Sequence, residues 1–410
     1  MNVACLLSGP NLIMSNDHHR AKPLKICLIA GETSGDMLGG QLMTALNKIS
    51  NLPIEFSGIG GEKMKEQGLN SFFPISDLSI MGISEILPSI PRVLSRIKET
   101  TIKITSGKPD AVVTIDAPGF CLRVASKLKR CNPDTRLIHY VAPSVWAWKK
   151  WRASRMSRYL DRVLTLFQFE SQYFDDVGLD SVFVGHPIVQ SGAMRGDGVG
   201  FRTDNEIQQD TKLICILPGS RSIEVTKHLP IIERTLDLLS KKLNNFQIVL
   251  PLADDVATYV RSVVQTWPYR ITFTEGNDNR KYNAFAASDV ALACSGTVAL
   301  ELALADIPYV TIYKMSFLSR IVARTFVRLK YVNLINIILD KEVVPELLLE
   351  NCKPHLILPH LMKALNDTEF RSKQRKNFKA ALGLITVGGH LPSERAAQAI
   401  LEVIAKKSVF

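Results

Sequence analysis

The chain has 410 residues with a formal net charge of +11 at pH 7, and 46% of its residues are hydrophobic. This length accommodates two domains of ordinary size, and no apolar run reaches the ~18 to 20 uncharged residues that a membrane-spanning helix needs. The positive charge indicates an anionic partner, which can be a nucleic acid, a phosphorylated substrate or an anionic membrane surface.

The first half of the chain alternates predicted strands with predicted helices. The strand at 25–30 leads through GETSGD, residues 31–36, into a helix at 37–48. The strand at 54–59 ends in two glycines and repeats the pattern. This alternation predicts a parallel α/β sheet, although the first glycine-containing turn is not the spaced motif of dinucleotide-binding folds.

A further strand, residues 111–115, delivers Asp116 to its carboxyl end. Ligands of open α/β sheets bind beyond the carboxyl ends of the strands, so a carboxylate at this place suits catalysis. The alternative is that Asp116 caps the following helix, which an aspartate does without taking part in any chemistry.

Residues 80–98 combine apolar side chains at helical spacing with basic side chains and two prolines. An apolar face beside cations is typical of a segment that lies on a membrane surface. The alternative is a helix that packs its apolar face onto the protein core. The candidates for contact with lipid or acyl chains are Met81, Ile86, Leu87, Ile90, Val93 and Leu94.

Residues 136–152 contain three of the four tryptophans next to several cations. Aromatic side chains among cations bind phosphates, bases or a membrane interface, and they also close domain boundaries. His186 follows the last strand of this half, at 181–184, and is expected to cap or hinge the chain rather than to act as a base. The polar, glycine-rich segment at 191–210 is predicted to be a linker.

The second half repeats the alternation of strands and helices. The strand at 212–217 is followed by Pro218–Arg221, and the guanidinium of Arg221 suits a diphosphate because its charge and fork of donors match phosphate oxygens. The apolar strand at 290–293 is followed by the turn Ser295–Thr297 and by a helix. A helix that begins on such a turn directs unpaired N–H groups and the positive end of its dipole at an anion.

Glu301 lies one helical turn after Thr297 on the same helix face. A carboxylate at that depth commonly takes a ribose diol in nucleotide-binding folds. The alternative is an ordinary turn with Glu301 in solvent. Further along, the amides of Asn333 and Asn336 can reach a base or a phosphate, or merely cap turns. The chain closes with an amphipathic helix at 393–407.

Six short motifs follow one another along the chain. They are GETSGD at 31, MGISEIL at 81, IDAPGF at 115, HYVAPSVWAW at 139, LPGSR at 217 and SGTVALE at 295. Because these motifs occur in this order, the sequence resembles the lipid-A-disaccharide synthase family. The members of that family are inverting glycosyltransferases of the GT-B type. The resemblance covers residues 25–407 and implies an α/β fold of two Rossmann-like doubly wound domains that face each other across a cleft.

The resemblance divides the chain into five parts. We expect an N-terminal extension without ordered structure at 1–23, a domain for the acceptor, its acyl chains and the membrane at 24–190, the linker at 191–210, a UDP-sugar-binding domain at 211–390, and at 391–410 a C-terminal helix that packs on the N-terminal domain or on a partner subunit.

The resemblance implies the transfer of 2,3-diacylglucosamine from UDP to the 6-hydroxyl of 2,3-diacylglucosamine 1-phosphate (lipid X), which gives the β-1,6 lipid A disaccharide 1-phosphate and UDP in lipopolysaccharide biosynthesis. It further implies a cytoplasmic protein attached peripherally to the inner membrane, and it allows a homodimer. The scattered cysteines agree with reduced thiols in the cytosol. No nucleic acid, cofactor or metal is expected, the last because the sequence has no D-x-D pair.

The same resemblance implies roles for individual residues. Asp116 is the base that takes the proton of the attacking hydroxyl. Arg221 and the Ser295 turn stabilise the charge of the leaving diphosphate, and Glu301 holds the ribose. The expected nucleotide-binding residues are Gly219, Ser220, Arg221, Ser295, Gly296, Thr297, Glu301, Tyr313, Met315 and Asn336, with Tyr313 and Met315 on the uracil side. The acceptor-side candidates are Ser34 and Asp36.

Three alternative functions fit part of the sequence. Another UDP-sugar transferase or a UDP-N-acetylglucosamine epimerase shares the fold and the nucleotide site, but the apolar surface near residues 80–98 argues against both. A basic nucleic-acid-binding protein fits the net charge, but the tryptophan-rich basic segment is its sole support, since the sequence has no basic run or known motif of that kind.

Overall fold

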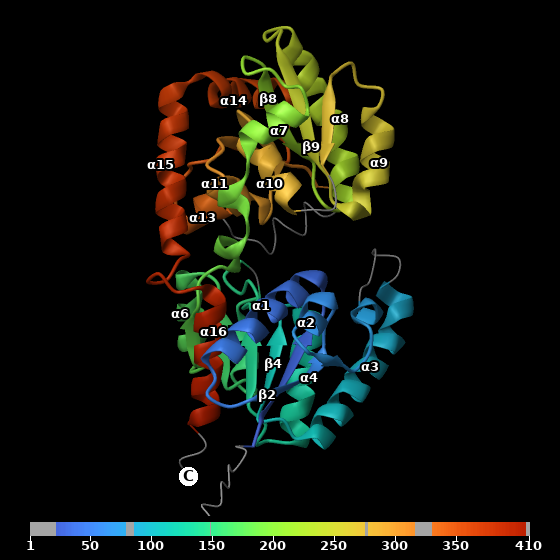
Figure 1. The fold of residues 1–410 in the computed structure, drawn as a ribbon, viewed down its shortest axis with the longest axis vertical. Helices are drawn as coiled ribbons and strands as arrows, with labels where there is room; N and C mark the ends of the chain where they lie inside the picture. Colours follow the sequence, from blue (N-terminus) through green and yellow to red (C-terminus); the bar gives the residue numbers. More distant parts are fainter. Residues whose placement is uncertain (1–21, 79–85, 148, 275–277, 316–329, 407–410) are drawn as a thin grey trace, which may run out of the picture.

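A computed structural model provides the structure of the chain, and it describes residues 22–78, 86–147, 149–274, 278–315 and 330–406. Two α/β units lie one above the other along the longest axis of the molecule (Figure 1), and each is built on one parallel sheet. This arrangement confirms the predicted fold class.

The N-terminal sheet has the strand order β3-β2-β1-β4-β5-β6-β7, with every neighbouring pair parallel. Its strands are β1 (Leu24–Ala30), β2 (Ile54–Ile59), β3 (Asn70–Ser71), β4 (Ala111–Ile115), β5 (Leu137–Tyr140), β6 (Arg162–Thr165) and β7 (Ser181–Phe183). Its helices are α1 (Thr33–Ile49), α2 (Glu62–Glu66), α3 (Ile86–Gly107), α4 (Pro118–Cys131), α5 (Trp151–Met156) and α6 (Ser171–Asp175).

The C-terminal sheet has the order β10-β9-β8-β11-β12-β13 and is likewise parallel. Its strands are β8 (Lys212–Leu217), β9 (Phe246–Pro251), β10 (Ile271–Thr274), β11 (Val290–Cys294), β12 (Tyr309–Tyr313) and β13 (Glu346–Leu348). The later helices are α7 (Gly198–Asp204), α8 (Ser222–Ser240), α9 (Asp254–Val264), α10 (Asp278–Ala287), α11 (Val298–Leu304), α13 (Leu334–Leu339), α14 (Pro354–Asn366), α15 (Thr368–Leu384) and α16 (Pro392–Ala405).

Each sheet changes direction beside its first strand. The chain builds outward from β1 and from β8 on one side, then returns to place β4 beside β1 and β11 beside β8. At such a switch point the loops after the two central strands diverge and leave a crevice for ligands. The crevices follow β1 and β4 in one unit and β8 and β11 in the other.

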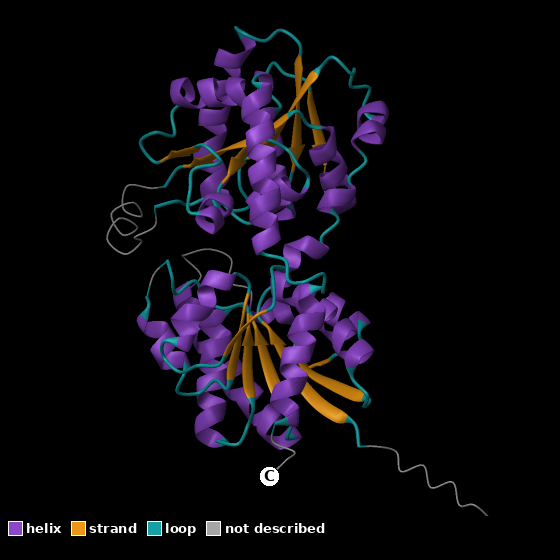
Figure 2. Cartoon of the chain, turned by 90° about the vertical axis from the view of Figure 1, so that its left-hand side faces the viewer, coloured by secondary structure: helices purple, strands orange, loops and turns teal. Residues whose placement is uncertain are grey.

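The central strands are mainly apolar because helices cover both faces of each sheet (Figure 2). β4 and β11 are buried at every residue. Gly58 of β2 has a φ of +140°, and a Cβ atom there would lie 1.8 Å from the carbonyl oxygen of Leu28. Glycine at this position therefore allows β2 to pair closely with β1.

The segment predicted as a linker contains helical turns that pack on the C-terminal unit. Arg202 of α7 donates to the carbonyl of Ala287 at 2.9 Å and pairs with Asp289 at 3.0 Å. These contacts bind the segment to α10 and β11, so it has defined structure.

The last helix returns to the N-terminal unit and lies against α1 (Figure 1). The buried guanidinium of Arg162 donates to the carbonyl of Ala399 at 2.8 Å and pairs with Glu402 at 3.0 Å. Lys48 of α1 pairs with Glu394 at 2.7 Å. The amphipathic C-terminal helix thus completes the core of the N-terminal unit in this chain.

Candidate active site

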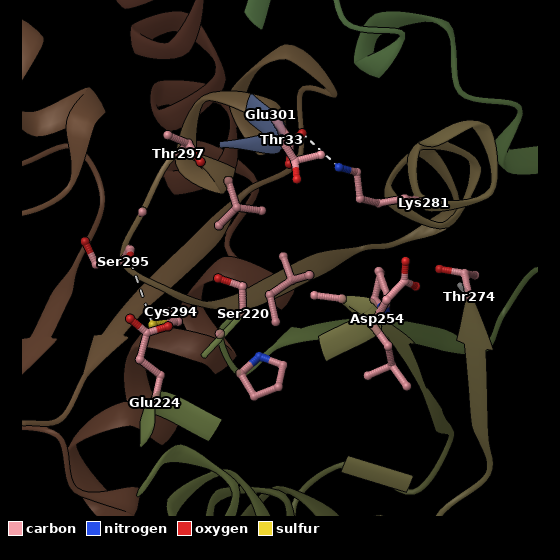
Figure 3. A pocket seen from close by; sticks show the side chains of 18 of the residues that line it. Thr33, Ser220, Glu224, Asp254, Thr274, Lys281, Cys294, Ser295, Thr297 and Glu301 are labelled. Atoms are coloured by element: carbon pink, nitrogen blue, oxygen red, sulfur yellow. Dashed lines mark hydrogen bonds and ion pairs between the residues drawn. The ribbon is translucent and has the colours of Figure 1, made fainter. Parts of the chain in front are cut away.

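A cavity of about 720 Å³ lies between the two units, beyond the carboxyl ends of the C-terminal strands (Figure 3). Thr33 and Met37 of α1 form its N-terminal wall. The rest of its lining comes from the C-terminal unit: Leu217, Pro218, Gly219, Ser220, Glu224, Pro251, Leu252, Ala253, Asp254, Thr274, Lys281, Cys294, Ser295, Gly296, Thr297, Val298 and Glu301. The cavity therefore occupies the crevice of the C-terminal unit and is closed on the other side by the first turns of α1.

The loop after β8 turns sharply into α8 at one end of the cavity. Gly219 has a φ of +123°, and a Cβ atom there would lie 2.7 Å from a carboxylate oxygen of Glu224. Arg221 precedes the first turn of α8, its side chain is 82% exposed, and its nearest guanidinium nitrogen is 3.6 Å from Glu224. The cation is thus at the cavity edge and accessible to an anionic ligand.

The turn after β11 faces the same end of the cavity. The Ser295 hydroxyl donates to the carbonyl of Val332 at 3.2 Å, while Gly296 and Thr297 are exposed. Among the residues that the structure describes, no heavy atom beyond the chain neighbours of Gly296 lies within 4 Å of the place where this residue would carry a Cβ atom. Together with the loop after β8, this turn brings the predicted phosphate-contacting residues to one place.

Glu301 is mostly buried on α11 and is held by two neighbours from α10. Its Oε1 atom accepts a hydrogen bond from Lys281 Nζ at 2.9 Å and one from the Tyr282 hydroxyl at 3.1 Å. The carboxylate lines the cavity beside Lys281 (Figure 3). The alternative of a solvated Glu301 is wrong, because its side chain is only 15% exposed and is paired.

The nucleotide-binding candidates after β12 do not line the cavity. The buried Asn336 amide donates to the Val344 carbonyl and to Glu346, and its oxygen accepts from two backbone N–H groups. These bonds connect α13 to the segment before β13. The Asn336 side chain therefore holds the backbone of Val343 and Val344 in place.

Asn333 has a similar structural role. Its oxygen accepts from the Ile335 N–H and its nitrogen donates to Thr311, so it caps α13 and ties it to β12. Tyr313 and Met315 are half-buried at the end of β12. They lie beyond the cavity wall formed by Cys294 and Ser295, since β12 is the next strand outward from β11.

In the N-terminal unit, the turns after β1 and β4 meet at Asp116. Asp116 and Ala117 have φ values of +51° and +43°, a strained conformation of the kind that clusters at functional sites. The Ser34 hydroxyl donates to Asp116 Oδ2 at 3.3 Å. A Cβ atom on Gly31 would lie 2.4 Å from the Cβ atom of Ala117, so glycine allows the two turns to touch.

Glu32 is a candidate that the sequence analysis missed. Partial burial first and the charge of Asp116 second raise the pKa of the Glu32 carboxyl, while the charge of Arg221 opposes the shift. Glu32 directly precedes Thr33, which lines the cavity, so it is a candidate at the N-terminal wall. Its position within GETSGD, directly after a strand, was the available signal.

The structure gives Asp36 a backbone-capping role. The helix begins at Thr33 rather than at residue 37, so Asp36 lies in the first turn of α1 and is buried. Its carboxylate accepts from the N–H groups of Gly61, Lys63 and Met64 at 2.7 to 3.0 Å. It anchors α2 to α1, whereas Ser34 faces Asp116.

His186 caps a short turn, as predicted. Its Nδ1 atom accepts from the Ile188 N–H at 3.1 Å, and its backbone N–H donates to the carbonyl of Ile385 near the end of α15. Burial lowers the pKa of His186 to about 4. The residue therefore joins the end of β7 to the segment that leads into α16.

The apolar-basic segment is partly described. Met81 lies outside the described residues, and for Ile86, Leu87 and Ile90 the structure describes the backbone alone, as the start of α3. Val93 is half-buried against the core, whereas Leu94 is 54% exposed. No helix among the described residues is long and apolar enough to cross a membrane.

The two parallel α/β units, each with a switch point beside its first strand, make this a protein of paired Rossmann-like domains. Solved structures share this fold. UDP-GlcNAc 2-epimerase from Neisseria meningitidis bound to UDP-GlcNAc matches 93% of this chain and 100% of its own, with a TM-score of 0.60 at 13% identity. The S. aureus MnaA–UDP co-structure matches 94% of this chain and 97% of its own, with a TM-score of 0.63 at 14% identity.

The sequence comparisons define the family. A family model described as lipid-A-disaccharide synthetase matches residues 26–400. Lipid-A-disaccharide synthase of Rhodospirillum centenum is 47% identical over 95% of this chain and 96% of its own length. That of Paramagnetospirillum magneticum is 44% identical over 92% and 97%. The chain belongs to the lipid-A-disaccharide synthetase family of glycosyltransferases, and the epimerase alternative is not favoured.

Proposed function

We propose that the chain transfers 2,3-diacylglucosamine from UDP to the 6-hydroxyl of 2,3-diacylglucosamine 1-phosphate, giving the β-1,6 lipid A disaccharide 1-phosphate and UDP. The observation that carries the proposal for this chain is a cavity lined from both units, with Thr33 and Met37 of α1 on one side and Gly219 and Ser220 on the other. Ser34, next to Thr33, donates to Asp116, and Arg221 follows Ser220. A base and a leaving-group cation next to opposite walls of one cavity suit transfer between two bound sugars.

The chemistry follows from this placement. The acceptor 6-hydroxyl oxygen attacks the anomeric carbon of the donor sugar, and the bond from that carbon to the β-phosphate oxygen breaks. Asp116 takes the hydroxyl proton, because a sugar hydroxyl is a poor nucleophile without a base in hydrogen-bond reach. The bonding electrons leave with UDP, whose new charge is stabilised by Arg221 and the polar turns at Ser220 and Ser295.

The cavity supports one orientation of the nucleotide. Its phosphate end lies at Ser220 and Ser295, and Glu301 stands beside the middle, where it would accept from the ribose hydroxyls (Figure 3). The cavity continues to Leu252 and Thr274 at the ends of β9 and β10. We therefore place the uracil there. For the backbone at Tyr313–Met315, next to the cavity wall at Cys294 and Ser295, we propose a place beside the donor sugar as the alternative to the expected contact with uracil.

The catalytic assignment is tested by Asp116→Asn, with Asp204→Asn on the exposed face of α7 as the control. Purified protein receives UDP-diacylglucosamine with and without the acceptor, and UDP release is measured. We expect acceptor-dependent release that falls at least ~10²-fold in Asp116→Asn while UDP still binds. Acceptor-independent release would contradict the reaction, and an unimpaired Asp116→Asn would contradict the base.

We also propose peripheral attachment to the cytoplasmic face of the inner membrane through α3. Leu94 and Lys98, one helical turn apart on this helix, are both exposed, and the lipid substrates reside in that membrane. Leu94→Ser should reduce co-sedimentation with anionic phospholipid vesicles, whereas Leu384→Ser, an exposed leucine on α15, should not. Equal binding of both variants would contradict attachment through α3.

The predicted homodimer is checked by light scattering, which should give twice the monomer mass.

A further inference from the structure

His228 is a fully buried histidine of α8 whose two ring nitrogens are both used. Nδ1 lies 2.7 Å from the carbonyl oxygen of Pro218, and Nε2 lies 2.9 Å from the backbone nitrogen of Lys314. A carbonyl can only accept and an N–H group can only donate. Nδ1 therefore carries the hydrogen and Nε2 accepts, which is one defined tautomer of the neutral ring.

These two bonds join loops that the sheet itself does not connect. Pro218 precedes the phosphate loop Gly219–Arg221 after β8, and Lys314 follows β12. β8 and β12 are not neighbours, because β11 lies between them. The imidazole thus spans the end of β11, where the turn at Ser295 begins.

The contacts around His228 hold both loops. The ring packs on Tyr313 with centroids 5.9 Å apart, and the Lys314 side chain donates to the carbonyl of Leu349 at 2.9 Å. Gly219, next to Pro218, has a φ of +123°, which glycine adopts readily because it has no Cβ atom. The imidazole therefore anchors a loop whose glycine gives it conformational freedom.

We propose that His228 is a positioning residue for glycosyl transfer. This inference rests on the proposed function. The imidazole ring sets the distance between the phosphate loop and the Tyr313–Met315 loop, which borders the donor sugar. The bond to Pro218 governs diphosphate binding. The bond to Lys314 governs placement of the sugar that is transferred.

Two substitutions separate the two bonds. In His228→Asn the amide nitrogen takes the place of Nδ1 and can still donate to Pro218, but nothing reaches Lys314. In His228→Gln the amide oxygen takes the place of Nε2 and can still accept from Lys314, but the bond to Pro218 is lost. His355→Gln, on the exposed first turn of α14, is the matched control.

The dissociation constant of UDP is measured by calorimetry, and kcat and KM for UDP-diacylglucosamine by UDP release, with the melting temperature as the fold control. We expect His228→Asn to keep the UDP affinity within ~2-fold but to lose at least ~10-fold in kcat/KM. His228→Gln should weaken UDP itself about 10-fold. The control should match the wild type in both readouts.

The proposal is overturned if both variants have the UDP affinity and kcat/KM of the wild type. It is also overturned if UDP affinity and kcat/KM fall together in both variants in proportion to the melting temperature, because this result indicates a structural role alone. The UDP measurement does not depend on the reaction. If the wild type binds UDP but transfers no sugar, the proposed function fails, while the difference in UDP affinity between the variants still decides the role of His228.

Discussion

Glu301→Gln tests the proposed position of the ribose. The wild-type carboxylate would accept hydrogen bonds from both ribose hydroxyls, and hydrogen bonds to charged groups contribute about 1.5–3 kcal/mol each, against about 0.5–1.5 kcal/mol for neutral ones. The amide retains one acceptor oxygen and no charge. We therefore expect a loss of about 2–3 kcal/mol, which is roughly a 30- to 150-fold rise in the dissociation constant of UDP.

The substitution is mild for the fold. Lys281, which pairs with Glu301, has a side chain that is 28% exposed, so water can solvate its cation once the pair is lost. Tyr282 can still donate to the amide oxygen across 3.1 Å. A change in UDP affinity should therefore report the ribose contact rather than collapse of the cavity.

Calorimetric titrations with UDP and with 2′-deoxy-UDP measure the effect. In the wild type the missing hydroxyl should weaken binding, whereas in Glu301→Gln the difference in affinity between the two ligands should be smaller, because the neutral amide makes a weaker hydrogen bond to the hydroxyl. Glu62→Gln, whose side chain is 81% exposed on α2, is the control for loss of one negative charge. The reasoning is refuted if Glu301→Gln changes the UDP affinity by less than ~3-fold, or if the 2′-deoxy penalty is unchanged.

Three further substitutions test catalysis, packing and titration. Ser34→Ala removes the hydroxyl that donates to Asp116 at 3.3 Å, and steady-state UDP release should show a kcat lower by about 2- to 10-fold with KM unchanged. Gly58→Ala places a Cβ atom 1.8 Å from the carbonyl oxygen of Leu28, and urea unfolding should show a loss of at least ~4 kcal/mol or no folded protein. Burial lowers the pKa of His186 to about 4, below its ordinary 6.5, so the free energy of unfolding should fall by about 3 kcal/mol as the pH drops from 6.5 toward 4. His186→Asn, which keeps an acceptor but does not titrate, should lose that part of the pH dependence.

Each of these predictions has a contrary result. A KM effect without a kcat effect in Ser34→Ala would mean that the hydroxyl binds substrate and does not position Asp116. A Gly58→Ala protein of wild-type stability would mean that β2 can move away from β1. Identical pH profiles of wild type and His186→Asn would mean that other groups control the acid limb.

The sequence alone determined the architecture and the places of the site. Parallel strands covered on both faces must be apolar throughout, so the runs at 111–115 and 290–293 are visible in the sequence as strands. Residues that directly follow such strands lie at the carboxyl edge of a sheet, which is why Asp116, Arg221 and Ser295 could be placed at that edge without a structure. The motif order was sufficient to identify the family.

Only the tertiary structure decided which polar side chains face a ligand. Asp36 and Asn336 resemble site residues in the sequence, yet their side chains bind backbone groups of separate segments, Gly61 and Val344 among them. A carboxylate or amide near a turn can hydrogen-bond to a ligand or to the backbone equally well, and the local sequence does not distinguish the two. The groups that lie near the side chain in space distinguish them.

The same limit explains what the sequence analysis did not find. Lys281 pairs with Glu301 from a different helix, and His228 joins loops from two strands that are not adjacent. Each role depends on two or three segments that meet through the packing of helices on a sheet. The sequence therefore specified where the strands end, and the packing of distant segments specified which side chains work together there.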